Sequence, residues 1–482
     1  IRITTDYNDM GLVRSRHVRS GNRHTGWRSY RWDVGARLMS MRGNLLPEPV
    51  IFDYDSMCNL VRGDYSMYES VFRTPDKVGN LYREDGCKGR EYDRGGRLLW
   101  DGEYHYRYDC EGNLVHKSRR DVSVPENGHT GKKGWLGMLF SADDADNKDN
   151  SLETDPFACW QPGDTCYEWQ SNGMLAGVRT PDGRTVTFGY DALGRRVSKR
   201  TGDTVHRFGW DGNVVLHEWD TDEADRPKLV TDETGREEYD GTEKPEGLVT
   251  WVYDGTSFTP VAKVTDGERY TIVHDYLGTP TQAYDSKGEL VWEMLLDVYG
   301  KVAECHGDRT LVPFRYQGQY EDEETELYYN RFRYYDPNTG TFISQDPIRL
   351  LSGESNFYAY VKDPNTWLDI FGLSTTHLHH TIPREVYNPR SGKPAMLPEH
   401  LVNDPDIRGR AGNPNRWSIP ADEHIALHKK NRPGGDYNTR WKQELDLLDP
   451  DKSKWTKQDI LDIRDKLTKE FGIDKYKPKC KK

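Results

Sequence analysis

Over most of the chain, short stretches of alternating polar and apolar residues predict β-strands. Residues 184–190 alternate polar residues with β-branched or aromatic ones, which is the period-two pattern of a strand with one buried face. Turn signals separate such stretches. They occur at Tyr92-Asp93, Tyr108-Asp109, Tyr190-Asp191 and Tyr284-Asp285, each with a glycine three residues after the aspartate. Because Asp accepts hydrogen bonds from turn amides and Gly adopts the positive φ of a tight turn, the repeat predicts a one-dimensional succession of hairpins.

From residue 374 onward the pattern changes and predicts helices. Residues 438–448 fit a helix with Trp441, Leu445 and Leu448 on one face. Residues 456–459 resemble a capping box that opens a second helix. The positions of that helix that we expect to face inward are Ile460, Ile463, Leu467 and Phe471. These stripes predict a small hydrophobic core and carry no catalytic meaning.

The composition agrees with a β-rich protein of more than one domain. The 482 residues are only 34% hydrophobic but 12% aromatic, with 29 Tyr and 14 Trp, which suits sheets with aromatic ladders better than a helical core. No apolar run approaches the roughly 20 residues of a membrane span, and no signal peptide is recognisable. Because the chain begins at Ile1, we expect a fragment or a processed product.

The seven cysteines are scattered, and none forms a CxxC pair. Their spacing therefore indicates neither a zinc knuckle nor a disulfide framework, and reduced thiols are expected.

The charge is unevenly distributed. Residues 374–482 hold 22 basic and 16 acidic residues, a net charge of +6, so the rest of the chain contributes -18 to the total of -12. A basic tail on an acidic body is typical of a module that faces nucleic acid. Electrostatic docking of the tail on the body explains the asymmetry equally well.

An ordered series of motifs makes the repeat specific. It runs through residues 276–280 (YLGTP), 314–320 (FRYQGQY), 326–337 (ELYYNRFRYYDP) and 339–347 (TGTFISQDP). The series resembles the Rhs core of YD-repeat proteins, loosely from about residue 60 and closely after about 270. Two stretches, residues 121–155 and 220–247, interrupt the repeats.

The resemblance implies a mainly β fold and three regions. In Rhs proteins the repeats spiral into a hollow β-cocoon that encloses a toxin. We expect residues 1–270 to be a partial YD-repeat shell and residues 271–373 to be the C-terminal region of the Rhs core with a self-cleavage motif. Residues 374–482 would be a toxin domain with a small α+β fold.

Residues 358–373 (YAYVKDPNTWLDIFGL) resemble the end of the Rhs core, where the family cleaves its own chain. The implied scissile bond joins Leu373 to Ser374. The family uses paired aspartates, and the matching positions are Asp346 and Asp369, with Asp363 as a weaker candidate. Two nearby carboxylates cannot both ionise cheaply, so one serves as an acid while the other activates water. The alternative is that these aspartates only cap turns, and Ile370 stands where the family has Pro.

The tail contains the segments HLHHTIPRE (377–385), NPNRWSIP (413–420) and HIALHK (424–429). Together they resemble the HNH, or His-Me finger, nucleases, whose ββα-metal fold holds one divalent cation. The resemblance implies that His379, His424 and His428 bind the metal, that His380 is the general base, and that Asn415 orients it. A neutral imidazole with a pKa of about 6.5 can take a proton at physiological pH.

Several points of the tail assignment stay open. The ion could be Mg²⁺, Zn²⁺, Mn²⁺ or Ni²⁺. Asn403 and Asn413 compete with Asn415, and Asp422 or Glu423 could enter the metal shell. A structural zinc site is an alternative to catalysis. The basic residues that could contact phosphates are Arg416, Lys429, Lys430 and Arg440, although for each one taken singly a solvated charge is the safer interpretation.

The resemblance implies a secreted interbacterial toxin effector, made in the producer cytoplasm and delivered into a target cell by a type VI or related system. The released nuclease would hydrolyse phosphodiester bonds in nucleic acid, with DNA favoured over RNA. Expected partners are a cognate immunity protein and a secretion-system loader such as a VgrG-type spike or a chaperone. The alternative is a cell-surface YD-repeat adhesion protein with a zinc-stabilised tail.

Overall fold

The computed structural model is mainly β, as predicted, with 44% of residues in strands and 10% in helices. It describes residues 1–65, 70–84, 86–122, 157–231, 233–243, 245–255, 257–352, 354–373, 376–380, 397–398, 401, 416–420, 437–449 and 451–473. Among these residues, no helix has the length and apolarity needed to span a membrane.

Two large antiparallel sheets carry the repeats, and in both of them neighbouring strands follow one another along the chain. The seven-stranded sheet comprises β1 (Arg2–Tyr7), β2 (Val13–Ser20), β3 (Arg23–Trp32), β4 (Leu38–Gly43), β5 (Leu46–Tyr54), β6 (Leu60–Asp64) and β7 (Val71–Phe72). The sixteen-stranded sheet comprises β10 (Glu91–Tyr92), β11 (Leu98–Trp100), β12 (His105–Tyr108), β13 (Leu114–Ser118), β14 (Thr165–Trp169), β15 (Leu175–Arg179), β16 (Thr185–Tyr190), β17 (Arg196–Thr201), β18 (Thr204–Asp211), β19 (Val214–Asp222), β22 (Glu246–Tyr253), β23 (Pro260–Val264), β24 (Arg269–His274), β25 (Pro280–Tyr284), β26 (Leu290–Leu296) and β27 (Val302–His306).

Smaller elements complete the fold. A four-stranded sheet is formed by β28 (Tyr320–Asp322), β29 (Leu327–Asn330), β30 (Arg333–Asp336) and β31 (Thr341–Phe342), in that order. Two-stranded sheets pair β8 (Thr74–Pro75) with β9 (Leu81–Tyr82), β20 (Leu229–Thr231) with β21 (Glu237–Tyr239), and β32 (Thr376–His380) with β33 (Arg416–Pro420). The α-helices within the described residues are α5 (Tyr437–Leu445) and α6 (Lys457–Glu470).

The repeated aspartate closes each turn by the hydrogen bonds expected from the sequence. At Asp191, the carboxylate accepts from the amides of Leu193 at 2.9 Å and Arg195 at 2.8 Å. The amide of Gly194, with φ of 70°, donates to the Asp191 carbonyl at 2.9 Å. The same bonds recur at Asp109 and Asp285.

The aromatic residue before that aspartate has a second role. The ladder shifts register at each such position, for example between Gly189 and Tyr190. The hydroxyl of Tyr190 then donates to the carbonyl of Leu175, near the start of the preceding strand, at 2.8 Å. Tryptophan does the same through its indole N–H, since Trp210 donates to the Arg196 carbonyl at 2.7 Å. A buried carbonyl left without a partner costs about 1–3 kcal/mol, so these bonds satisfy the backbone where the ladder is interrupted.

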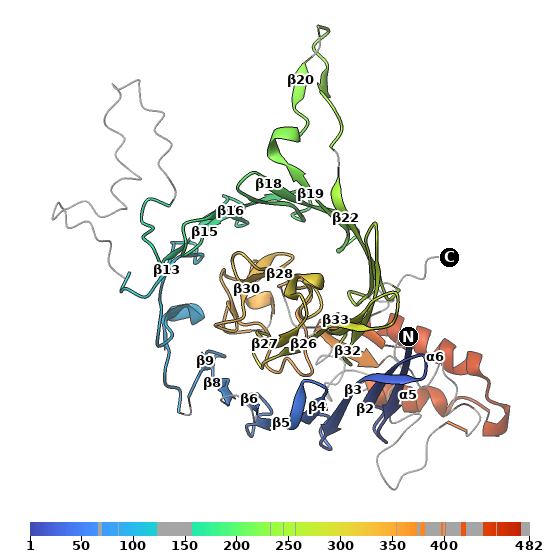
Figure 1. Ribbon diagram of the computed structural model, residues 1–482. Coiled ribbons are helices and arrows are strands. Elements are labelled where there is room, and N and C mark those ends of the chain that lie inside the picture. The colour runs from blue at the N-terminus through green and yellow to red at the C-terminus, as the bar shows by residue number, and fades with distance from the viewer. Residues whose placement is uncertain are drawn as a thin grey trace.

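The strands of the two large sheets, which we call the shell, curve around a compact inner segment (residues 312–373) that contains β28 to β31 (Figure 1). Buried shell residues such as Val178 and Val186 belong to one apolar cluster with Val312, Leu327 and Ile343 of the inner segment. A second cluster lies mainly within that segment and includes Tyr328, Tyr335, Tyr360 and Ile370. The last part of the repeat region is therefore packed against the inner face of the shell.

One of the two interruptions predicted from the sequence is a projecting arm. β20 and β21 pair as a hairpin that extends away from the shell (Figure 1). The other interruption falls largely outside the described residues.

The two helices predicted in the tail are confirmed. The first spans Tyr437–Leu445, so Leu448 lies in the turn that follows it rather than in the helix itself. The second has the predicted capping box, in which Thr456 accepts from the Asp459 amide. Its inward residues are buried with Trp441 in a separate hydrophobic cluster.

Candidate functional site

Three side chains far apart in the sequence meet at the end of the repeat region. Arg333, the first residue of β30, is buried, and its Nη2 lies 3.3 Å from Asp346 Oδ2 and 3.3 Å from Asp369 Oδ2. Asp346 follows β31, and Asp369 belongs to the final loop of the inner segment. The structure therefore places the two aspartates predicted from the sequence against the same guanidinium nitrogen.

The same cluster holds the residues that precede the predicted scissile bond. Asp369 Oδ1 accepts from the amide of Leu373 at 3.0 Å. Arg333 Nε donates to the Gly372 carbonyl, and its Nη1 donates to the Phe357 carbonyl at 3.1 Å. The chain from Asp369 to Leu373 is thus fixed at both ends, while Ser374 lies outside the described residues.

Burial shifts the protonation of both carboxyls. It raises the pKa of Asp369 to about 6, against the opposing charge of Arg333 and the Leu373 amide. Burial also raises the pKa of Asp346, again opposed by Arg333. Desolvation in turn lowers the pKa of Arg333. A carboxyl with a pKa raised to about 6, such as Asp369, can hold a proton at a higher pH than a solvated carboxyl, as a general acid requires.

Gly372 allows the chain to approach the cluster closely. Its φ is 67°, in the left-handed region that favours glycine. A Cβ built there would lie 2.6 Å from the Asn330 carbonyl oxygen and 3.3 Å from the Arg333 backbone nitrogen. The glycine of the predicted cleavage motif is therefore required by both conformation and space.

Both aspartates also cap turns, as the alternative interpretation predicts, because their carboxylates accept hydrogen bonds from backbone amides. Asp346 accepts from Ile348 at 2.9 Å. Asp363, the weaker candidate, caps a turn without an ion pair to Arg333 in the described part of the chain. Its carboxylate accepts from Asn365 at 3.0 Å and Thr366 at 2.8 Å. The geometry favours Asp346 and Asp369 over Asp363 as the pair.

Two residues of this site were not assigned a role from the sequence, namely Arg333 and Asn330. The Asn330 side-chain amide donates to the Asp369 carbonyl at 2.9 Å and helps to position the loop. Each lies next to two buried tyrosines, Asn330 at the end of β29 and Arg333 at the start of β30. A buried charge within an aromatic strand is the signal that could have identified Arg333, because such charges need partners.

The structure describes only some of the site residues that were predicted in the tail. β32 pairs with β33 in an antiparallel register that sets His379 opposite Trp417 and His380 opposite Arg416. The two segments that carry the first histidines and the end of the asparagine motif are therefore neighbours. Asn415, His424, His428, Lys429 and Lys430 lie outside the described residues.

Arg440, predicted as a phosphate contact, lies in α5 and joins acidic residues. Its guanidinium contacts Glu444 at 2.9 Å and Glu470 of α6 at 2.9 Å. The pair with Glu444 lies within α5, and the pair with Glu470 links α5 to α6, which indicates a structural role for this arginine.

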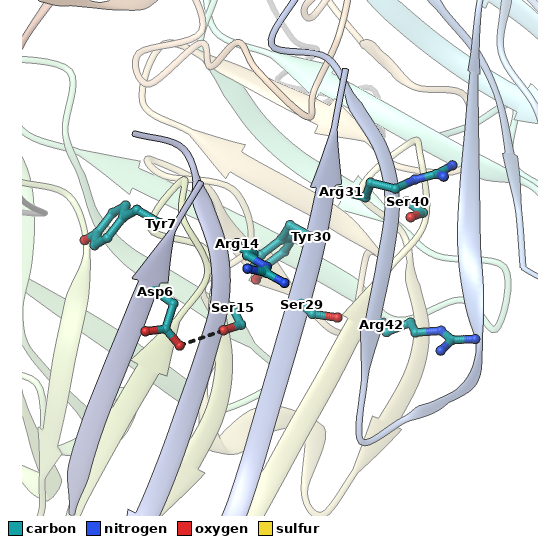
Figure 2. A pocket seen from close by; sticks show the side chains of 9 residues that line it. All are labelled: Asp6, Tyr7, Arg14, Ser15, Ser29, Tyr30, Arg31, Ser40 and Arg42. Atoms are coloured by element: carbon teal, nitrogen blue, oxygen red, sulfur yellow. Dashed lines mark hydrogen bonds between the residues drawn. The ribbon is translucent and has the colours of Figure 1, made fainter. Parts of the chain in front are cut away.

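A pocket of about 790 Å³ lies over β1 to β4, far along the chain from the aspartate cluster. It is polar, and Figure 2 shows Arg14, Arg31 and Arg42 around it, with Asp6 accepting from Ser15 at 3.0 Å. None of the site residues predicted from the sequence lines it.

Comparison with known proteins finds a family model that matches part of the repeat region. Residues 158–360 match the family model of the teneurin YD-shell. Over these residues the chain is similar to YD-repeat proteins. The part that matches contains Arg333 and Asp346, whereas Asp369 and Leu373 follow it.

Two curated relatives of this chain are named as a toxin and as a nuclease. It is 29% identical over 384 residues to double-stranded DNA deaminase toxin A of Burkholderia cenocepacia, which covers 73% of this chain and 22% of that protein. It is 28% identical over 383 residues to the probable deoxyribonuclease RhsA of Dickeya dadantii, with 77% and 22% covered. The chain thus spans about a fifth of the length of these relatives.

Among solved structures, the TcdB2–TccC3 complex without its hypervariable C-terminal region resembles this chain with a TM-score of 0.46 and 18% identity. The similarity covers 77% of this chain and 18% of that one.

Proposed function

We propose that this chain is the closing part of the shell and the tail of a secreted interbacterial toxin, which cuts itself after Leu373 to release a metal-dependent nuclease. The observation that carries the proposal is the buried cluster of Arg333, Asp346 and Asp369, which holds the loop that leads to Leu373. The names of the two curated relatives support a toxin that acts on nucleic acid.

In the proposed cleavage, the two carboxyls divide the acid and base roles. Asp369, whose pKa burial raises to about 6, gives a proton to the carbonyl oxygen of Leu373. Asp346, with its charge balanced by Arg333, takes a proton from the attacking water. The water oxygen bonds to the carbonyl carbon. Asp346 then passes the proton that it took to the Ser374 nitrogen as the C–N bond breaks, so Ser374 leaves as a free amine, and the new carboxyl group of Leu373 returns a proton to Asp369. Arg333 and Asn330 position the loop through Gly372 and Asp369.

The proposed nuclease rests on the histidine motif of the tail. His379, His424 and His428 would hold one divalent ion, which when bound offsets charge on the scissile phosphate. His380 takes the proton from the attacking water, and Asn415 orients its ring. The ligand set rests on the sequence motif, because His424 and His428 lie outside the described residues and nothing is described of the His379 side chain.

The two relatives share similar extents of this chain but differ in their named chemistry, one being a deaminase and the other a deoxyribonuclease. We therefore infer that the shell does not determine the reaction, which depends on the tail. The histidine motif favours phosphodiester hydrolysis, with DNA preferred over RNA. Arg416, Lys429 and Lys430 would contact phosphates. Delivery through a spike or chaperone loader and neutralisation by a cognate immunity protein belong to the same proposal.

Cleavage is tested on purified full-length chain by electrophoresis and N-terminal sequencing. The wild type should yield a fragment beginning at Ser374, and Asp346→Asn and Asp369→Asn should remain intact. Asp363→Asn is the matched control, because this carboxyl is also buried but caps a separate turn. Cleavage that persists in Asp369→Asn, or that is lost only in Asp363→Asn, contradicts the assignment.

Nuclease activity is tested with the same cleaved protein on plasmid DNA and on RNA, with each candidate ion added in turn. We expect degradation of DNA by the wild type and at least a roughly 100-fold loss in His380→Ala. If both proteins are inert and the wild type instead binds zinc and melts on chelation, the tail is a zinc-stabilised binding module.

A further inference from the structure

A cluster of two cysteines and a histidine lies in the shell, remote from both proposed active sites. The ligand atoms of His116, Cys159 and Cys166 all lie within 4.8 Å of one another. The cysteines are seven residues apart and the histidine precedes them by more than forty, so no spacing motif indicates the group. The fold brings them together.

Strand pairing explains two of the three positions. His116 in β13 and Cys166 in β14 are cross-strand partners in the antiparallel ladder, where opposite side chains on one face lie about 5 Å apart. Both are buried. Their side chains therefore meet on the same face of the sheet.

A folded loop supplies the third position. Trp160 donates from its indole N–H to the carbonyls of Asp164 at 2.8 Å and Thr180 at 3.0 Å. Its amide donates to the Phe157 carbonyl at 2.9 Å, so residues 157–164 form a compact turn before β14. This turn places Cys159 Sγ at 3.8 Å from Cys166 Sγ.

We propose that His116, Cys159 and Cys166 bind a zinc ion that ties β13 to β14. Two thiolates at about 2.3 Å from one tetrahedral zinc ion lie about 3.8 Å apart, which is the separation found here. A disulfide would require about 2.05 Å. Thiolate and imidazole ligands together select zinc over the hard cations Mg²⁺ and Ca²⁺.

The surroundings are those of a metal ligand set. Asp164, itself 2% exposed, contacts Nε2 of His116 at 3.0 Å. The same carboxylate oxygen contacts Arg120 at 2.7 Å and the Gln161 amide at 3.1 Å, so it orients the ring and leaves Nδ1 for the metal. Arg107 donates to Cys159 Sγ at 3.5 Å.

The site lies at a weak point of the shell. β13 and β14 share two residue pairs, whereas β18 and β19 share eight. The connection between β13 and β14 is also the long interruption of the repeats. A zinc ion bound to both strands and to the turn between them strengthens the pairing of β13 with β14, because binding to the folded state adds to stability.

The test uses full-length protein in which zinc has been replaced by cobalt. The wild type should show the near-ultraviolet charge-transfer band of a thiolate–cobalt bond, with about one equivalent bound through cysteine. The proposed tail site cannot produce this band, because its ligands are all imidazoles, so the two metal sites are distinguished. Cys159→Ser and Cys166→Ser should lose the band.

Two further variants sharpen the result. Cys305→Ser is the matched control, since Cys305 is a partly buried cysteine of β27, and it should keep the band. Asp164→Asn should keep the band but bind the ion about 10–100-fold more weakly. Because Cys159 is exposed, its serine variant should fold, which circular dichroism checks. Wild-type protein without the band, or with Cys159 and Cys166 joined as a disulfide in unreduced peptides, overturns the proposal.

Discussion

Replacing Gly372 with alanine should slow self-cleavage far more than it destabilises the shell. The added Cβ meets the Asn330 carbonyl oxygen at 2.6 Å. Restoring an ordinary contact of 3.4 Å displaces the loop by about 0.8 Å, and a misplacement of about 1 Å at a reacting centre can cost roughly 100-fold in rate. We therefore expect cleavage after Leu373 to slow by about two orders of magnitude.

The control separates crowding from backbone strain. Gly212, in the turn between β18 and β19, has a φ of 60°, and no heavy atom lies within 4 Å of the position that a Cβ would take there. Alanine there bears the left-handed conformation, which costs about 1–2 kcal/mol, partly offset by the lower entropy of the unfolded chain. Gly212→Ala should thus lose a little stability and cleave at the wild-type rate.

The assay follows the appearance of the fragment that begins at Ser374 after the chain is refolded from denaturant. Samples are quenched over time and quantified on gels, and the folded fraction is measured in parallel by tryptophan fluorescence. If Gly372→Ala cleaves within twofold of Gly212→Ala at equal folded fraction, the close approach of Gly372 to the cluster has no part in cleavage.

Three other measurements test the remaining reasoning. Because burial raises the pKa of Asp369 to about 6, its protonated form is lost as pH rises, and cleavage should slow about tenfold per pH unit above 6; a rate that rises between pH 6 and 8 contradicts the acid role. Tyr253→Phe removes the 2.9 Å bond to the Val215 carbonyl and should cost about 1–3 kcal/mol in urea unfolding, whereas the exposed control Tyr239→Phe should cost nothing measurable. Ala36→Gly relieves a φ of 65° and should stabilise the chain by about 0.5–1 kcal/mol; an unchanged or lower unfolding midpoint contradicts this.

The turn repeat was predictable where the sequence keeps both the aspartate and the glycine three residues later. It was missed where another residue adopts the left-handed conformation of that glycine. At Asp33 the amide of Ala36, with φ of 65°, donates to the aspartate carbonyl at 3.1 Å, as a glycine does elsewhere. At Asp55 the corresponding residue is Cys58, with φ of 67°. The resemblance therefore faded toward the N-terminus although the same turn continues there, because other residues can occupy the left-handed conformation at a cost in free energy.

The candidate sites show the same limit. The motif predicted Asp346 and Asp369 from residue types alone, but the cation between them depends on how β30 packs against the final loop. The cluster of His116, Cys159 and Cys166 was invisible to spacing rules, which led to an expectation of unrelated thiols. Strand register and a loop turn, rather than proximity in sequence, create that cluster.

The cleavage cluster is a product of the folded shell, and this has a consequence for timing. The Phe357 carbonyl accepts from both Arg333 and the Asp346 amide, while the Phe357 amide donates to the Gly95 carbonyl of a shell turn at 3.3 Å. Tyr358 donates to the carbonyl of Gly112 in the next turn at 2.6 Å. Outside this packing both carboxyls would return to water and to their ordinary pKa values near about 4. Because the burial that raises those pKa values requires the shell turns to be in place, we expect the proposed cleavage to follow folding of the shell rather than precede it.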